Sequence, residues 1–248
     1  MCGKRKDSPV YKRKSSPNVD AITEITLKAI ALPKTVCIGN AGCKCMHIND
    51  CGVKRDMSQI RVLHDPNGVA GLAIIIPTLH GDSRGYFMET YNANEMNAEG
   101  LNLTFVQDNQ SCSSKGVLRG LHFQKHFPQG KLVRVISGEV YDVAVDLRKA
   151  SSSYGKYYGI VLDGEANQQF YIPPGFAHGF LVLSDIAVFA YKCTDFYHPN
   201  DEGGLAWDDP DINIDWPLEQ LGDSQILLSE KDKKNPTLKE LEQQGFSF

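Results

Sequence analysis

The chain has 248 residues, of which 42% are hydrophobic and 23% charged, and its formal net charge is -4. Such a composition supports an apolar core and gives no general reason to expect a nucleic-acid partner. No apolar run approaches the roughly 20 residues that cross a bilayer, and the basic start lacks the apolar stretch of a signal peptide. We therefore expect a cytoplasmic protein that binds neither nucleic acid nor membrane.

The first 56 residues differ in composition from the rest of the chain. They are rich in Lys, Arg, Ser and Cys, and such residues bury too little apolar surface to offset the entropy of ordering. We expect a poorly ordered N-terminal extension over 1–56 and one compact domain over 57–248. A targeting segment is the alternative interpretation of the extension.

Most of the cysteines lie in this extension. Their spacing does not match the paired Cys-x-x-Cys pattern of zinc sites, so we predict no metal site there. We expect no disulfides, because cytosolic thiols stay reduced. The cysteines of the extension are Cys2, Cys37, Cys43, Cys45 and Cys51.

From about residue 58 the pattern changes to short strands separated by turn signals. An apolar run at 71–79 ends at the turn sequence HGDSRG, and residues 92–100 predict a helical turn that stops at Gly100. The alternating runs on either side of Gly138 predict a β-hairpin. Further strands are expected at 119–124, 158–162, 168–173, 178–184 and 187–196, and a C-terminal helix at 236–245.

Many short strands, few helices and close-spaced turns predict an all-β fold, a double-sheet barrel or jelly roll. Such a barrel can enclose a cavity lined by inward-facing polar side chains. In the run after Gly138, Tyr141, Val143 and Val145 share an apolar face, whereas Asp142 lies on the opposite, partly polar face.

Six long segments lie in the order and spacing of one known family, the dTDP-4-dehydrorhamnose 3,5-epimerases, which this chain resembles from about residue 58 to 240. The segments are GDSRGYFMETYN, FVQDNQSCSSKGVLRGLHFQ, QGKLVRVISGEVYDVAVDLRK, YIPPGFAHGFLVLSD, YKCTDFYHP and LSEKD. The resemblance implies a cupin-like jelly-roll barrel that works as a homodimer without a metal or other cofactor. It also implies epimerisation of dTDP-4-dehydro-6-deoxy-D-glucose at C3 and C5, in the biosynthesis of dTDP-L-rhamnose.

The resemblance also assigns catalytic roles. The C4 ketone of the substrate acidifies the hydrogens on C3 and C5, so inversion needs a base on one face and an acid on the other. The matching positions are His122 as the base and Tyr191 as the acid. Asp232 matches the carboxylate that holds His122 in one tautomer, and Lys131 matches the cation beside the C4 oxygen.

Eight further residues resemble substrate contacts of the family. Tyr197 matches an aromatic residue that stacks on thymine, and Arg119 suits a phosphate through its fork of donors. Arg84 and Glu89 resemble nucleotide contacts that reach in from the partner subunit. The full set is Arg84, Glu89, Gln107, Asn109, Arg119, His178, Tyr197 and Lys231.

Two local features need a structural explanation. Strict alternation along RGLHFQ puts Arg119 and His122 on opposite faces, although the family places both at the site, so we predict a bulge at Gly120. Relatives often carry a basic residue shortly after the stacking tyrosine, where this chain has Gly203 and Gly204. This difference predicts one phosphate contact fewer.

Three alternatives stay open at this point. A relative that inverts only C3 or only C5 would keep the same base and acid. A metal-dependent oxygenase on the same barrel would need clustered ligands such as a His-x-His pair, which the β region lacks. A non-catalytic sugar-nucleotide binder would be expected to lose the base or the acid, and candidates for both are present.

Overall fold

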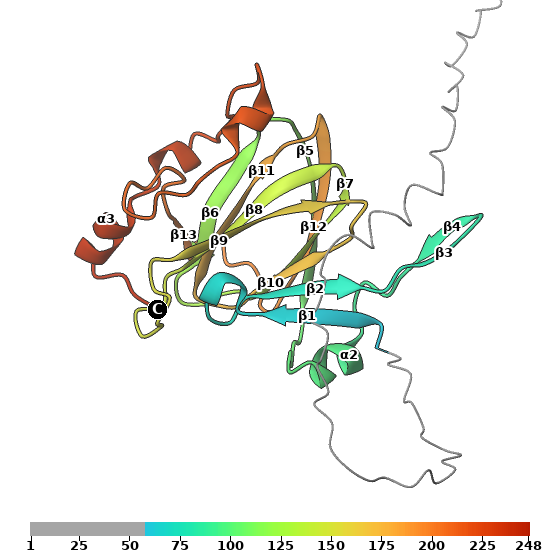
Figure 1. Cartoon of the computed structure of the whole chain (residues 1–248). Helices are drawn as coiled ribbons and strands as arrows, with labels where there is room; N and C mark the ends of the chain where they lie inside the picture. The colour runs from blue at the N-terminus through green and yellow to red at the C-terminus, as the bar shows by residue number, and fades with distance from the viewer. Residues whose placement is uncertain (1–57) are drawn as a thin grey trace, which may run out of the picture. The chain divides into compact units, whose positions relative to one another are not determined.

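The computed structural model describes residues 58–248. The predicted extension over 1–56 and its cysteine cluster lie outside the described residues. Within them, strands form two main antiparallel sheets and a separate small hairpin. The all-β fold with a few short helices is therefore confirmed (Figure 1).

The two sheets differ in size. The first has the order β1 (Ile60–His64), β2 (Ala73–Pro77), β10 (Gln169–Ile172), β7 (Lys131–Ser137), β12 (Ile186–Cys193) and β5 (Gln107–Ser114). The second has the order β13 (Glu202–Gly204), β6 (Leu118–Gln124), β11 (Phe176–Val182), β8 (Glu139–Asp146) and β9 (Tyr157–Asp163). The hairpin of β3 (His80–Asp82) and β4 (Gly85–Phe87) projects from the body of the molecule (Figure 1).

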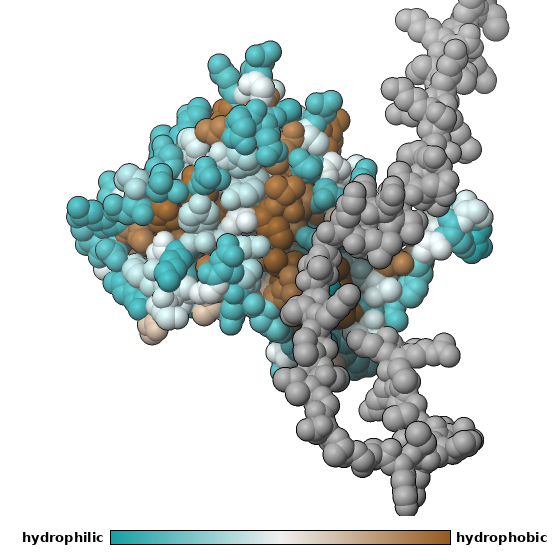
Figure 2. Space-filling view, in the orientation of Figure 1, coloured by the Kyte–Doolittle hydropathy of each residue, from teal (hydrophilic) through white to brown (hydrophobic). Residues whose placement is uncertain are grey.

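The main apolar core lies between the two sheets. Val133 and Phe189 enter it from the first sheet, and Ala144 and Phe180 enter it from the second. Every second residue of these strands points inward, as the period of a half-buried strand requires. On the face shown in Figure 2, an apolar strip interrupts a mostly hydrophilic surface in the region of β9 and β2.

The outer faces of the sheets are covered in different ways. The segment after β13 packs Trp216 and Leu241 against Leu121 and Val143 on the outer face of the second sheet. The helix α2 (Ala93–Ala98) places Met96 on the outer face of the first sheet. The strands that carry inward-pointing polar side chains are therefore packed against apolar layers on their outer faces, and this packing holds the strands in place.

The predicted hairpin around Gly138 is wrong. The strands β7 and β8 follow each other in sequence, but β7 pairs with β10 and β12, whereas β8 pairs with β11 and β9. Gly138 has a φ of +83°, and a Cβ there would lie 2.2 Å from the carbonyl oxygen of Ile186. The glycine therefore turns the chain from one sheet to the other, and burial of both inner faces outweighs local pairing.

The two helices predicted within residues 58–248 are confirmed, whereas a helix expected around the run AITEITLKAIAL falls outside the described residues. Asn92 caps α2 through its side chain, and Gly100 follows the helix in the left-handed region. The C-terminal helix α3 (Leu238–Gln243) begins with a capping box of Thr237 and Glu240. The remaining helices are the 3-10 turns η1 (Pro66–Gly68), η2 (Leu218–Leu221) and η3 (Asp232–Lys234). No helix within residues 58–248 has the length and apolar character of a membrane span.

Candidate active site

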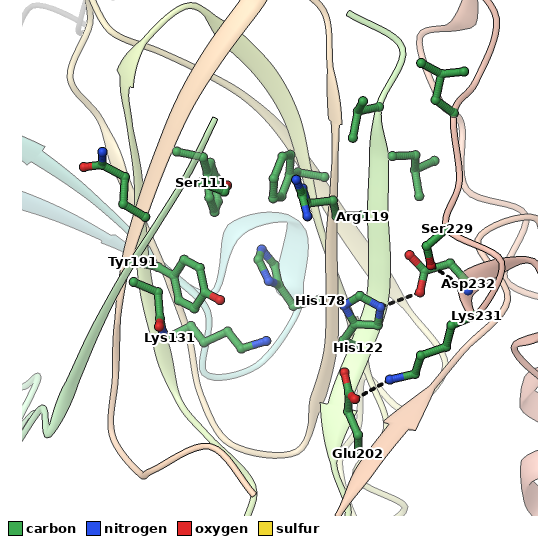
Figure 3. A pocket seen from close by; sticks show the side chains of 17 residues that line it. Ser111, Arg119, His122, Lys131, His178, Tyr191, Glu202, Ser229, Lys231 and Asp232 are labelled. Atoms are coloured by element: carbon green, nitrogen blue, oxygen red, sulfur yellow. Dashed lines mark hydrogen bonds and ion pairs between the residues drawn. The ribbon is translucent and has the colours of Figure 1, made fainter. Parts of the chain in front are cut away.

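A cavity of about 530 Å³ opens into the barrel between the two sheets. Its walls come from β5, β6, β7, β11, β12 and β13, and a segment that includes η3 contributes one side. Figure 3 shows the polar side chains of these elements pointing into one shared space. Eight of the predicted site residues line it: Asn109, Arg119, His122, Lys131, His178, Tyr191, Lys231 and Asp232.

The bulge predicted in β6 is confirmed. His122 lies opposite His178, and Arg119 lies opposite Phe180, so three steps along β6 match two along β11. At the bulge, Gly120 has a φ of +134°, and a Cβ there would lie 2.6 Å from the Cα of Gly179. The extra residue turns Arg119 and His122 toward the same side, and both line the cavity.

His122 forms a close pair with Asp232, which comes from η3, 110 residues further along the chain. The distance from Nε2 to the Asp232 Oδ1 is 2.7 Å, and the backbone N–H of Asp232 donates to the Ser229 hydroxyl. Burial acts to raise the pKa of Asp232, but the hydrogen bond with His122 and its other contacts hold it below the usual value. An ionised Asp232 accepts from Nε2–H, which leaves Nδ1 as the nitrogen that can take up a proton.

A second histidine–carboxylate pair lies deeper in the barrel. His178 Nε2 lies 3.0 and 3.1 Å from the two carboxylate oxygens of Asp142. Both side chains are almost fully buried, and burial raises the pKa of Asp142 and lowers that of His178. The sequence prediction gave Asp142 no role. The available signal was its position on the inward-facing side of β8.

Tyr191 and Lys131 face His122 from the first sheet. Figure 3 shows His122 and Tyr191 on opposite sides of the cavity, with the Lys131 side chain reaching between them. Burial raises the pKa of the Tyr191 hydroxyl, so the phenol keeps its proton at neutral pH. Burial lowers the pKa of Lys131.

The mouth of the cavity carries charged and polar groups. Glu202 on β13 forms an ion pair with Lys231 and accepts a hydrogen bond of 3.1 Å from the Tyr197 hydroxyl (Figure 3 shows the ion pair). Glu202 was missed by the sequence prediction, although it lies five residues after the predicted stacking tyrosine. On the neighbouring strand β6, Arg119 Nε donates to the Ser113 hydroxyl at 3.1 Å.

Gln107 and Tyr197 lie next to the lining residues. The Gln107 side chain donates to Asn109 at 3.1 Å and accepts from the backbone N–H of Tyr197 at 3.0 Å.

Close packing explains the two glycines that follow Tyr197 in the sequence. A Cβ at Gly203 would lie 2.4 Å from the Phe123 ring, and one at Gly204 would lie 2.0 Å from Asn235, so neither position has room for a basic side chain.

Arg84 and Glu89 do not reach this cavity. Arg84 lies at the exposed turn of the β3–β4 hairpin, where it pairs with Asp82. Glu89 accepts a hydrogen bond of 2.8 Å from the side chain of Asn92. Their predicted role as contacts to a partner subunit's substrate stays a prediction.

Residues 58–248 contain no group of three or more His, Cys, Asp or Glu side chains that could hold a metal ion.

Sequence and structure comparisons find similar proteins among known epimerases. The family model described as dTDP-4-dehydrorhamnose 3,5-epimerase matches residues 66–240. The dTDP-4-dehydrorhamnose 3,5-epimerase of Methanothermobacter thermautotrophicus is 56% identical over 170 residues, which cover 68% of this chain and 91% of that protein.

Two solved structures are also similar. The dTDP-6-deoxy-D-glucose-3,5-epimerase of Legionella pneumophila, in complex with dTDP-4-keto-L-rhamnose, has a TM-score of 0.70 and 46% identity, covering 76% of this chain and 97% of that one. A 3'-monoepimerase from Streptomyces bikiniensis, in complex with dTDP-quinovose, has a TM-score of 0.66 and 32% identity, covering 72% and 89%.

Proposed function

The chain belongs to the dTDP-4-dehydrorhamnose 3,5-epimerase family, and we propose how its cavity carries out that reaction. The substrate is dTDP-4-dehydro-6-deoxy-D-glucose, and the product is dTDP-4-dehydro-L-rhamnose. Each inversion removes a proton from a carbon next to the C4 ketone and returns a proton to the opposite face. The intermediate is an enolate, whose negative charge lies largely on the C4 oxygen.

His122 is the proposed base. Its pairing with Asp232 holds the proton on Nε2, so Nδ1 accepts the proton from the sugar carbon. The imidazolium that results is stabilised by the adjacent carboxylate, whose pKa is held low by the same contact. Because Asp232 is anchored by Ser229, the ring keeps one orientation during the transfer.

Tyr191 is the proposed acid, and Lys131 is the proposed stabiliser of the enolate. The raised pKa of Tyr191 keeps the phenol protonated until the enolate carbon takes the proton. The ammonium of Lys131 reaches into the space between acid and base, where the C4 oxygen would lie. A preorganised donor at such an oxygen is typically worth about 3–4 kcal/mol in the transition state.

One observation carries the proposal: the imidazole of His122, paired with Asp232, and the phenol of Tyr191 face each other across one cavity, into which the Lys131 side chain also reaches. The shared cavity has the size range of small-molecule sites. A non-catalytic binder would have no need of this opposed acid and base. The direct contacts that we propose for the nucleotide sugar come from Arg119, His178, Asn109 and Lys231.

A homodimer is part of the proposal. Arg84 lies in the turn of the projecting hairpin, and Glu89 comes shortly after its second strand. Neither residue lines the cavity of its own chain. Tyr86 and Phe87 on that hairpin are 58% and 65% exposed, as expected of a surface that another subunit covers. In the dimer, this hairpin would bring Arg84 and Glu89 to the nucleotide in the partner's cavity. The cytoplasmic location stays a prediction.

The test is solvent exchange in heavy water. The protein is incubated with dTDP-4-dehydro-6-deoxy-D-glucose in D₂O, and NMR locates deuterium on the sugar ring. We expect deuterium at both C3 and C5, with inversion of both centres. A sample without protein measures the spontaneous exchange that the ketone causes.

Label at only one carbon would contradict the double epimerisation and identify a single-centre epimerase, such as the similar 3'-monoepimerase. Binding of the nucleotide sugar without any exchange above the control would contradict catalysis altogether. The remaining alternative would then be a sugar-nucleotide-binding protein on the same barrel.

A further inference from the structure

The loop between β12 and β13 carries Tyr197, the residue proposed to stack on thymine. The loop has no helix or strand of its own, and Tyr197 is 48% exposed. A stacking platform binds a base well only when its ring already occupies the bound position, since ordering a loop on binding costs affinity. Contacts from outside the loop must therefore fix it.

Gln124 supplies such contacts from the strand that carries the base. It lies two residues after His122 on β6, so the two side chains share a face, and it is only 4% exposed. Its Nε2 donates to the carbonyl oxygens of Phe127 at 2.8 Å and Phe196 at 3.2 Å. Its Oε1 accepts from the backbone N–H of His198 at 2.6 Å.

These partners determine the orientation of the Gln124 amide. Reversing it would place Oε1 against two carbonyl oxygens and the NH₂ group against a backbone N–H, so every one of the three contacts would become unfavourable. The side chain is thus buried with both ends of its amide in use. Its hydrogen bonds hold the residues directly before and after Tyr197.

Gln107 holds Tyr197 itself from the other sheet. Its Oε1 accepts from the Tyr197 backbone N–H at 3.0 Å. Three successive residues of the loop, Phe196 to His198, therefore bond through their backbones to glutamine side chains of β6 and β5. The Phe127 ring also stacks on the His198 ring, with centroids 4.2 Å apart.

We propose that Gln124 is a positioning residue that fixes Tyr197 for the nucleotide, at a set place relative to the base His122. The inference rests on the proposed function, because it takes Tyr197 as the nucleotide platform. The strand β6 then carries both the base His122 and Gln124, the residue that positions the Tyr197 ring. The distance between the reacting sugar carbon and the stacked thymine then depends on β6, together with the contact from Gln107 on β5.

The test replaces Gln124 by methionine, which has a similar shape but lacks the amide. We expect the Kd for dTDP, measured by calorimetry, and the KM for the nucleotide sugar to rise about tenfold, since stacking on an aromatic ring contributes strongly to base binding. The kcat should change by less than about twofold, because His122 and Tyr191 keep their places. A loss confined to kcat would overturn the proposal.

A double-variant cycle tests whether Gln124 acts through Tyr197. Tyr197→Ala by itself should weaken dTDP binding. Adding Gln124→Met to Tyr197→Ala should weaken binding further by less than about twofold, because the group that Gln124 places is already gone. The full tenfold effect in the Tyr197→Ala background would show that Gln124 does not act through Tyr197.

Two controls separate positioning from general loss of stability. Ser153→Ala removes hydrogen bonds of a fully buried side chain that does not line the cavity, so it should lower Tm but leave KM and the dTDP Kd unchanged. If Gln124→Met does not fold, Gln124→Asn keeps an amide that is too short for all three contacts, and the same rise in Kd is expected. An unchanged dTDP Kd in a folded Gln124 variant would overturn the inference.

The outcome is distinguishable from failure of the proposed function. If the wild-type protein bound dTDP but exchanged no deuterium, the epimerase proposal would fail, whereas the binding cycle on Gln124 and Tyr197 would still give an answer. If the wild-type protein epimerised its substrate but Gln124→Met bound dTDP normally, only the positioning role would fail.

Discussion

Two histidine–aspartate pairs each place a histidine at the cavity, and they use the same groups in different surroundings. His122 and Asp232 meet at its wall, and the His122 side chain is 31% exposed. His178 and Asp142 lie on neighbouring strands of one sheet, with 7% and 0% of their side chains exposed. The first pair joins a strand to a C-terminal segment, whereas the second lies entirely within the barrel wall.

The two environments have opposite effects on the carboxylates. The pKa of Asp232 is lowered, because contacts with His122 and Ser229 outweigh its burial. The pKa of Asp142 is raised by burial, and the pKa of His178 is lowered by burial. An imidazole beside a carboxylate that stays ionised, such as His122 beside Asp232, is suited to take up and release a proton. A fully buried imidazole such as His178 is better suited to a fixed, neutral contact with the substrate. Hydrogen-bond partners alone do not define the role of a histidine.

The largest effect is expected for removal of His122, the less buried histidine of the two pairs. His122→Ala should lower kcat by about 10³–10⁴-fold, because proton abstraction then lacks its base. The far-ultraviolet circular dichroism and the dTDP Kd should stay close to the wild-type values, which controls for folding and for binding of the nucleotide. Turnover near the wild-type rate would rule out His122 as the base.

Replacing each of the two aspartates by asparagine, its neutral isostere, should lower kcat by different amounts. Asp232→Asn should lower kcat by about 10²-fold, since the amide no longer enforces one tautomer of His122 or stabilises its charged form. Asp142→Asn should lower kcat by less than about tenfold, because burial already disfavours a charge at this position. Steady-state kinetics at neutral pH measure both. Equal losses would mean that the His178 pair also takes part in proton transfer.

The smallest effect is a difference in the pH dependence of stability. The lowered pKa of Asp232 stabilises the fold above the unfolded value near 3.8, and this contribution is lost as the pH falls through the folded pKa. The raised pKa of Asp142 means that its ionisation opposes folding, a cost that is absent below pH 3.8 and grows above it. The two carboxylates should therefore contribute to stability with opposite slopes against pH.

Thermal unfolding between about pH 6 and about pH 3 measures these slopes. On acidification, the Tm of Asp232→Asn should rise relative to wild type, and that of Asp142→Asn should fall relative to wild type. For a domain of this size, each kcal/mol of change in the free energy of unfolding should shift Tm by about 2–4 °C. Parallel slopes for the two variants would contradict the assigned directions.

Much of the site could be predicted from the sequence because its residues lie in long motifs. The motif RGLHFQ contains the proposed base, and the glycine within it correctly predicted the bulge that brings Arg119 and His122 together. Asp142 and Glu202 were missed, because a lone carboxylate in a strand does not show which other strand or loop supplies its partner. Gln124 was visible in the same motif, but its three partners come from loops that the strand pattern does not locate.

The sequence by itself indicated β2, the strands β6 to β12 and the two helices, because these follow from local periodicity, and its long motifs indicated the chemical types at the site. It did not indicate β1, β3, β4, β5 or β13. Only the tertiary structure decided which strands pair. Adjacent strands β7 and β8 separate at Gly138 into different sheets, and Asp232 meets His122 across 110 residues. Such long-range choices depend on how two sheets bury their inner faces against each other, and that free energy belongs to no single segment.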